Sequence, residues 1–300
     1  MSSPGTHESL LHAAKKYLAL DGQGFPTSNP ALLTLAVASV TGSANQDAIA
    51  EILVHGFLRG SRERFEEHVG PNMRTIDAAT FEMGTPAPQA RHFCGETPRH
   101  LVQLSPYRIA RYLVTNELYG LFDRARIDIP KSDRQNPVVA VSWFEAFVYA
   151  MWMGCRLPTE AEWEFACGAG RTSDWCCDRE NEVAQYAWYS ENAGGQIQPV
   201  ATRDPNSLGL FDLHGNVWEW CIDTYAQDYY RESPALDPIC TVSPTDSQCR
   251  HNVCRGGSVH ALAEMCRTRY RLHEPPNFSA SDLGFRLVAA EYSTNESRRA

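Results

Sequence analysis

The residues best suited to chemistry in this chain of 300 residues are ten cysteines and a few serine and histidine side chains. The cysteines form no paired CxxC motif and no regular spacing, so the sequence does not predict a zinc ribbon. Ser258 follows two glycines in the stretch 255–258 and would be a nucleophile only beside an activating base. No histidine-based activation motif accompanies it, and we expect Ser258 to make hydrogen bonds within a loop.

Net charge and composition exclude several classes of protein. Lys and Arg total 27 against 36 Asp and Glu, and the net charge of -9 argues against a nucleic-acid binder. No stretch reaches the roughly 20 apolar residues that a membrane-spanning helix needs. The first 30 residues lack the apolar region of a signal peptide, so we expect a cytoplasmic protein with mostly reduced thiols. If that compartment is wrong, Cys240 and Cys249 are the best candidates for a loop disulfide.

The elements that must position these side chains change in kind near residue 70. Helical spacing of apolar residues before that point predicts an N-terminal helical extension over 1–70. We expect it to pack as a small addition against the main domain, with a separate recruitment module as the alternative. Residues 71–292 alternate short apolar runs with Gly, Pro and Asn turns, which predicts one loop-rich α+β domain. Residues 293–300 are expected to form a disordered tail.

Two helices stand out in the second region. One runs from about Ser142 through Trp152, and the other from Thr159 to about Cys167. Ser142 and Thr159 are of the residue types that accept backbone hydrogen bonds at a helix N-cap. The second helix also begins with glutamates, which its N-terminal dipole favours.

Three long motifs carry a family resemblance. They are Arg156-Leu157-Pro158-Thr159-Glu160-Ala161-Glu162-Trp163-Glu164-Phe165-Ala166, Gly209-Leu210-Phe211-Asp212-Leu213-His214-Gly215-Asn216-Val217-Trp218-Glu219-Trp220, and Arg255-Gly256-Gly257-Ser258 with Gly284-Phe285-Arg286-Leu287-Val288. Together they closely resemble the formylglycine-generating-enzyme, or sulfatase-modifying factor, family over about residues 75–290. The resemblance implies an irregular C-type-lectin-like α+β fold. It also implies three kinds of relative: copper-dependent oxidases, iron-dependent sulfoxide synthases, and ligand-binding variable proteins diversified by retroelements.

One position decides between the copper oxidases and the rest. In those enzymes two cysteines, at the third and eighth places after Gly-Gly-Ser, hold Cu(I). Here the third place is Ala261 and the eighth is Cys266. A single thiolate does not suit Cu(I), and Cys254 precedes the motif, so we expect no copper. Cys266 would be catalytic only in an oxidase; otherwise we expect a small buried apolar residue.

The iron-type relatives bind metal through three histidines of an additional helical bundle. The first 70 residues offer only His7, His12, His55 and His68, and a segment of 70 residues is short for such a bundle. His7 and His12 are five residues apart, which does not place them on one helix face. We expect surface histidines, and an iron site is the weaker alternative.

The resemblance also implies a structural calcium site in the second motif. The matching positions are Asp212 and Glu219, through their carboxylates, with the backbone carbonyls of Gly215 and Val217. Hard oxygen ligands at a tight turn are what Ca²⁺ prefers. The alternative is that Asp212 caps the turn and Glu219 pairs with an arginine.

Five arginines in the third motif region have a structural interpretation as well. A guanidinium has five donors and can join several loop acceptors, which is the role we expect at least for Arg255 and Arg286. Trp218 and Trp220 are expected in the core. The remaining arginines of this region are Arg267, Arg269 and Arg271.

Residues 259–282 lie between Ser258 and the motif that begins at Gly284. The spacing of this segment resembles that of the variable proteins more than that of the oxidases. In the variable proteins the diversified positions are templated as Asn codons, which are then changed at their adenines. Most residue types of this segment can arise from an Asn codon in that way, although Glu274 cannot. Loops held on a rigid scaffold are where binding residues concentrate. We therefore expect a ligand-binding surface formed by Val259, His260, Ala261, Leu262, Tyr270, Leu272, His273, Glu274, Pro275, Asn277, Phe278, Ala280, Ser281 and Asp282.

The sequence thus supports a binding protein for an unknown protein or small molecule, with Tyr270, His273 and Phe278 as the expected anchors. A metal-dependent oxidoreductase or protein-maturation enzyme of the same family is the alternative. A regulatory domain that recruits a partner through its N-terminal helices is a third possibility. Nucleic acid and a membrane span are not expected.

Overall fold

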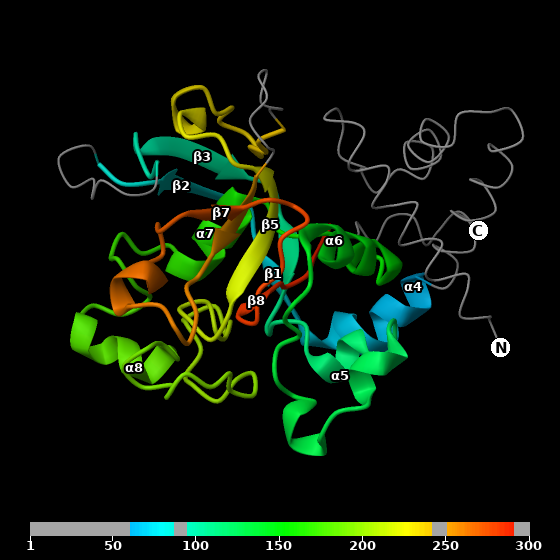
Figure 1. The fold of residues 1–300 in the computed structure, drawn as a ribbon. Coiled ribbons are helices and arrows are strands. Elements are labelled where there is room, and N and C mark those ends of the chain that lie inside the picture. Colours follow the sequence, from blue (N-terminus) through cyan, green and yellow to red (C-terminus); the bar gives the residue numbers. More distant parts are fainter. Residues whose placement is uncertain (1–60, 87–94, 242–250, 291–300) are drawn as a thin grey trace, which may run out of the picture.

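The computed structural model describes residues 61–86, 95–241 and 251–290, which form three small sheets and several short helices (Figure 1). The four-stranded sheet has the order β7-β6-β5-β8, with β5 at Trp218–Thr224, β6 at Asn252–Arg255, β7 at Leu272–Glu274 and β8 at Leu283–Gly284. All seven residues of β5 are buried, because this strand lies inside the sheet and is covered on both faces. The expected α+β architecture is confirmed.

The two smaller sheets are antiparallel. One has the order β1-β4-β9, with β1 at Met73–Ile76, β4 at Tyr107–Ala110 and β9 at Val288–Ala290. The other pairs β2 (Ala79–Met83) with β3 (His100–Leu104). Strand β9 brings the end of the domain back beside β4, so the two ends of the described domain are closed by one sheet.

The two expected helices are present, with capping boxes at their first turns. Helix α6 spans Trp143–Trp152 after the N-cap Ser142, and α7 spans Glu160–Gly168 after the N-cap Thr159. In each, the N-cap hydroxyl accepts a hydrogen bond from the third helical residue, whose glutamate accepts one in return from the N-cap backbone. The sequence signal was sufficient here because every partner lies within four residues.

Shorter helices connect these elements. They are α4 (Ser61–Arg64), η1 (Phe65–Val69), η2 (Gly70–Asn72), α5 (Asn116–Tyr119), η4 (Arg124–Ile127), η5 (Lys131–Asp133), η6 (Glu180–Glu182), α8 (Val183–Tyr186), η7 (Tyr229–Arg231) and η8 (Ala263–Cys266). Within the described part of the chain, no helix combines the length and apolar character needed to cross a bilayer.

The described end of the N-terminal segment packs into the main core. Phe65 and Val69 belong to the same buried apolar cluster as Trp143, Tyr149 and Phe285. The boundary that the sequence predicts near residue 70 is therefore crossed by core contacts. The rest of the predicted N-terminal extension, with His7, His12 and His55, lies outside the described residues, as do Cys249 and the predicted tail 293–300.

Candidate functional site

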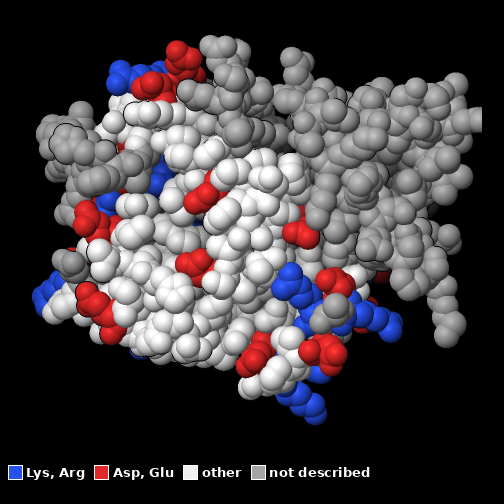
Figure 2. Space-filling model, viewed as in Figure 1, with Lys and Arg blue, Asp and Glu red and all other residues white. Residues whose placement is uncertain are grey.

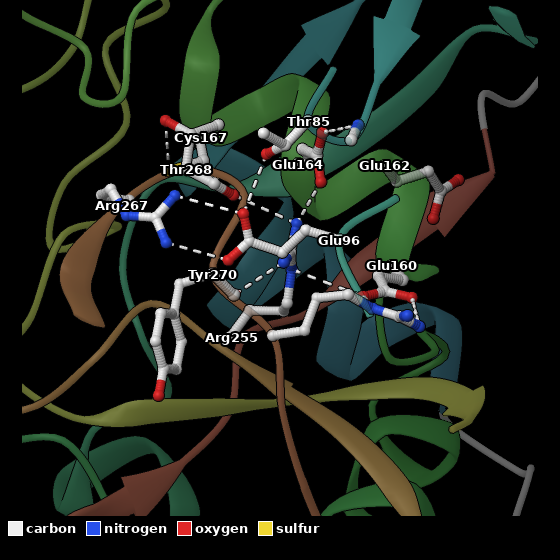
Figure 3. A network of polar contacts seen from close by, with 12 residues as sticks. Thr85, Glu96, Glu160, Glu162, Glu164, Cys167, Arg255, Arg267, Thr268 and Tyr270 are labelled. Atoms are coloured by element: carbon white, nitrogen blue, oxygen red, sulfur yellow. Dashed lines mark hydrogen bonds and ion pairs between the residues drawn. The ribbon is translucent and has the colours of Figure 1, made fainter. Parts of the chain in front are cut away.

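Arginines of the C-terminal segment point into the domain and end in buried ion pairs. Arg267 donates from its two terminal nitrogens to Glu96, at 2.9 and 3.2 Å (Figure 3). Arg271 donates from Nε and Nη2 to the two carboxylate oxygens of Glu160, at 2.6 and 2.8 Å. All four side chains are buried. The segment that carries these arginines is therefore held by long-range contacts to Glu96, in the connection between β2 and β3, and to Glu160 of α7.

Two further arginines fix the ends of the segment. Arg255 pairs with Glu164 and donates to the carbonyls of Tyr270 and Thr268, at 2.6 and 3.1 Å. Arg286 is fully buried and binds Glu219 through Nε and Nη2, at 2.5 and 2.6 Å. The expected role of Arg255 and Arg286, joining loops to carbonyls and carboxylates, is confirmed.

In the structure, the residues of the predicted ligand-binding surface are of three kinds: exposed, half-buried and buried. Its exposed members in the structure are His260, Leu262, Asn277, Phe278 and Ser281. Half-buried members are Tyr270, Leu272, His273, Glu274, Pro275, Ala280 and Asp282. In Figure 1 the segment, coloured orange to red, crosses the side of the molecule that faces the reader.

Two of the predicted surface residues are buried, which corrects the prediction. Val259 has no exposed area and its backbone nitrogen donates to the carbonyl of Asn216 at 3.0 Å. Ala261 is 4% exposed and its carbonyl accepts from the backbone nitrogen of Ser190 at 3.0 Å. Both therefore serve the framework on which the exposed residues are held.

Two of the three predicted anchors also have framework contacts. The ring of His273 stacks on that of Tyr225, with centroids 3.9 Å apart, and its Nδ1 lies 2.8 Å from Nδ1 of His251. The ring of Tyr270 contacts Trp218 at 5.9 Å. Of the three, only Phe278 is exposed, at 39%. Removing Tyr270 or His273 would thus disturb packing as well as any binding surface.

The residues at the copper positions do not fit Cu(I). The side chain of Ala261 has no donor atom, and Cys266 is fully buried. Burial raises the pKa of the Cys266 thiol to about 12, which disfavours the thiolate that a metal would need. Over the described ranges, no three His, Cys, Asp or Glu side chains are grouped so as to hold a metal ion.

His214 is a site residue that the sequence reasoning missed. It is 2% exposed, its Nδ1 lies 2.8 Å from the carbonyl oxygen of Cys266, and its Nε2 accepts from the backbone nitrogen of Cys176 at 3.0 Å. Since Nε2 accepts, Nδ1 carries the proton and donates to Cys266. The only sequence signal was a histidine beside Gly215 in the second motif.

His214 makes the stability of this region depend on pH. Burial lowers its pKa from 6.5 to about 4, so between these values the unfolded chain binds more protons than the folded one. Its contribution to stability is complete above pH 6.5 and is lost as the pH falls towards 4. We expect the free energy of unfolding to fall by up to about 3 kcal/mol from this source.

His214→Gln is the control for that prediction. A glutamine amide can donate to Cys266 and accept from Cys176 without titrating. In urea unfolding at a series of pH values, the wild type should lose more stability than the variant between pH 6.5 and pH 4. Equal losses in both proteins would contradict the assignment.

Three of the four predicted calcium ligands lie at the turn before β5, and the fourth, Glu219, is the second residue of that strand. Asp212 is 3% exposed; one carboxylate oxygen accepts from the backbone of Ala201 at 2.9 Å, and the other has no hydrogen-bond partner among the described residues. Burial raises the pKa of Asp212 to about 6. Both oxygens of Glu219, however, are bound by Arg286. Calcium binding by this set would require Glu219 to exchange the arginine for the cation, and it stays a prediction.

The family model of the sulfatase-modifying factor enzyme 1-like domain matches residues 60–291. The chain belongs to this family. It is 30% identical to the formylglycine-generating enzyme of Streptomyces coelicolor over 280 residues, covering 71% of this chain and 87% of that protein. The family resemblance that the motifs carry is therefore confirmed.

Two solved structures support the same fold. PvdO from Pseudomonas aeruginosa superposes with a TM-score of 0.63 at 24% identity, covering 73% of this chain and 94% of that chain. The Treponema denticola variable protein 1 superposes with a TM-score of 0.57 at 25% identity, covering 73% and 95%. The expected C-type-lectin-like fold of the formylglycine-generating-enzyme type is confirmed, and a variable protein is among its structural neighbours.

Proposed function

We propose that this family member is a binding protein whose recognition surface is the exposed part of residues 259–282. The observation that supports it best is that buried residues of the segment hold it in place while other residues of the same segment stay exposed. Arg267 and Arg271 fix it through buried ion pairs, while His260, Leu262 and Phe278 remain exposed. Two of the exposed residues, Leu262 at 59% and Phe278 at 39%, are large and apolar. Exposed apolar side chains on a rigid framework favour recognition of another molecule.

The surroundings of the segment support the same proposal. Ser258 donates to the carboxylate of Asp282 at 2.6 Å, which ties the start of the segment to its end. Figure 2, drawn from the same side, shows a face made largely of uncharged side chains with a few carboxylates among them. An unknown protein or small-molecule ligand with an apolar part would suit such a face.

The enzyme alternative has one observation in its favour, the identity to a formylglycine-generating enzyme. Ala261 weighs against it, because the copper relatives require a second soft ligand at that position. Cys266 alone would have to act as the catalytic residue. Its burial and raised pKa do not favour a reactive thiolate.

The proposal is tested by replacing the three exposed residues together, as His260→Ala, Leu262→Ala and Phe278→Ala. Each exposed site should cost within about 0.5 kcal/mol, so the fold should persist. Peptides selected from a displayed library on the wild-type protein should bind the triple variant at least about tenfold more weakly. The matched control is Leu101→Ala with Leu236→Ala, which removes apolar side chains that are 54% and 61% exposed elsewhere.

The two variants separate the outcomes. Peptides that lose affinity for the triple variant and keep it for the control would support the recognition surface. Peptides that bind both variants like wild type would place binding elsewhere and contradict the proposal. The gene offers a second test: a nearby reverse transcriptase with a near-repeat of the sequence encoding 255–288, differing mainly at adenines, is expected for a diversified protein.

A further inference from the structure

Two arginines outside the recognition surface converge on one turn. The guanidinium of Arg74 lies on the side of Gly209 from which a side chain would project: a Cβ built on that glycine would be 3.0 Å from Nε and 3.3 Å from Nη2. Arg111 donates from its Nε to the carbonyl oxygen of the same residue, at 3.3 Å. Both guanidinium groups therefore lie at the same turn, Arg111 on the carbonyl oxygen of Gly209 and Arg74 on the side where a Cβ would be.

Backbone contacts place Arg74 and Arg111 beside the Gly209 turn. Arg74 is in β1 and Arg111 follows β4, and the two strands pair with Met73 opposite Ala110. Gly209 has a φ of +76°, a conformation that favours glycine, and the missing side chain leaves the space that Arg74 occupies. Phe211, two residues on, donates its backbone nitrogen to the carbonyl of Arg111 at 3.0 Å.

Arg111 is also oriented by aromatic rings. Its guanidinium carbon lies 5.3 Å from the ring centroid of Tyr112 and 5.5 Å from that of Phe211. Stacking of this kind holds a guanidinium plane in place while its terminal nitrogens remain able to donate. Arg111 is half-buried and Arg74 is exposed, so the pair can be reached from solvent.

The two positive charges lack the partners that most described arginines have. Within residues 61–86, 95–241 and 251–290, no Asp or Glu forms an ion pair with Arg74 or Arg111 at 4 Å or less. Arg267, Arg271 and Arg286, in contrast, each pair with a carboxylate. This is unexpected in a chain with a net charge of -9. Two like charges held together without a counter-charge repel each other, and a bound anion removes that repulsion.

We propose that Arg74 and Arg111 form a binding site for a phosphate or carboxylate group at the Gly209 turn. The guanidinium fork matches the oxygen spacing of both groups, and two forks would bind one group from two sides. Gly209 serves the site by admitting Arg74 and by anchoring Arg111 through its carbonyl. The site is separate from residues 259–282 and does not depend on the proposed recognition function.

Calorimetric titration of the full chain with inorganic phosphate at low salt tests this site. We expect saturable binding of one phosphate by the wild type, weakened at least about tenfold by Arg74→Gln or Arg111→Gln. Arg231→Gln is the matched control, because it removes an exposed arginine that is paired with Asp228. A parallel titration with acetate shows whether a carboxylate binds as well as a phosphate does.

Two further variants keep the test decisive if Arg111→Gln disturbs packing. Arg111→Lys keeps the charge and loses the fork, so phosphate binding should weaken by less than with glutamine. Arg74→Lys likewise keeps the charge and loses the fork, so it should weaken phosphate binding by less than Arg74→Gln does. Absence of saturable binding by the wild type for both anions, or binding that is equal in Arg74→Gln and Arg231→Gln, would overturn the proposal.

Discussion

Arg286→Met is expected to destabilise the protein by about 3–5 kcal/mol, because it leaves the carboxylate of Glu219 buried without its partner. Neither side chain has any exposed area, and the two hydrogen bonds between them are 2.5 and 2.6 Å long. Arg286 also donates to the carbonyls of Ala110 and Phe211, at 3.2 and 3.0 Å, which the variant leaves without this donor. Urea unfolding of both proteins measures the difference.

The control is the double variant Arg286→Met with Glu219→Gln. It removes the uncompensated charge, so part of the lost stability should return. If the double variant is no more stable than Arg286→Met, the loss arises from the carbonyl contacts or from packing, and the ion pair is not its main cause.

The same variant tests the predicted calcium site. In Arg286→Met the carboxylate of Glu219 is released, so millimolar Ca²⁺ should raise the melting temperature more than it does in the wild type. Asp212→Ala should abolish that rise. Melting temperatures that do not respond to calcium or chelator in either protein would remove Ca²⁺ from this turn.

Ala261→Cys is expected to create tight binding of one Cu(I), stronger than in the wild type by about two orders of magnitude or more. The variant adds a second thiolate in the same buried cluster that contains Cys266. Two soft sulfur ligands suit Cu(I), and metal coordination offsets the burial that keeps the Cys266 thiol protonated. Competition with a Cu(I) chelator measures the affinity of each protein.

Two controls accompany this prediction. Ala261→Ser adds a side chain of similar size without a soft ligand and should leave copper affinity unchanged. Ala261→Cys with Cys266→Ser should lose the gain. Turnover on a cysteine-containing sulfatase peptide completes the test: tight copper binding with aldehyde product in the wild type would contradict the binding-protein proposal and favour the oxidase.

The features that could be predicted from the sequence are those whose signals are local or lie within one motif. Ser142 and Thr159 start their helices because each N-cap and its glutamate partner are three residues apart. The long motifs were sufficient for the family and the fold. The absence of a cysteine at position 261 is also read directly from the sequence.

Which residues pair across the domain depends on the fold and could not be predicted from the sequence. Arg271 and Glu160 are 111 positions apart, and Arg267 and Glu96 are 171 apart, so no periodicity pairs them. The same holds for His214 and Cys266, which are 52 positions apart.

The exposure of each side chain within 259–282 could not be predicted from the sequence either. Val259 and Leu262 are both aliphatic, yet one has no exposed area and the other is 59% exposed. The difference depends on which loops fold over each side chain, and those loops come from distant parts of the chain. Residue types and spacing therefore predicted the scaffold, while long-range packing selected its exposed surface.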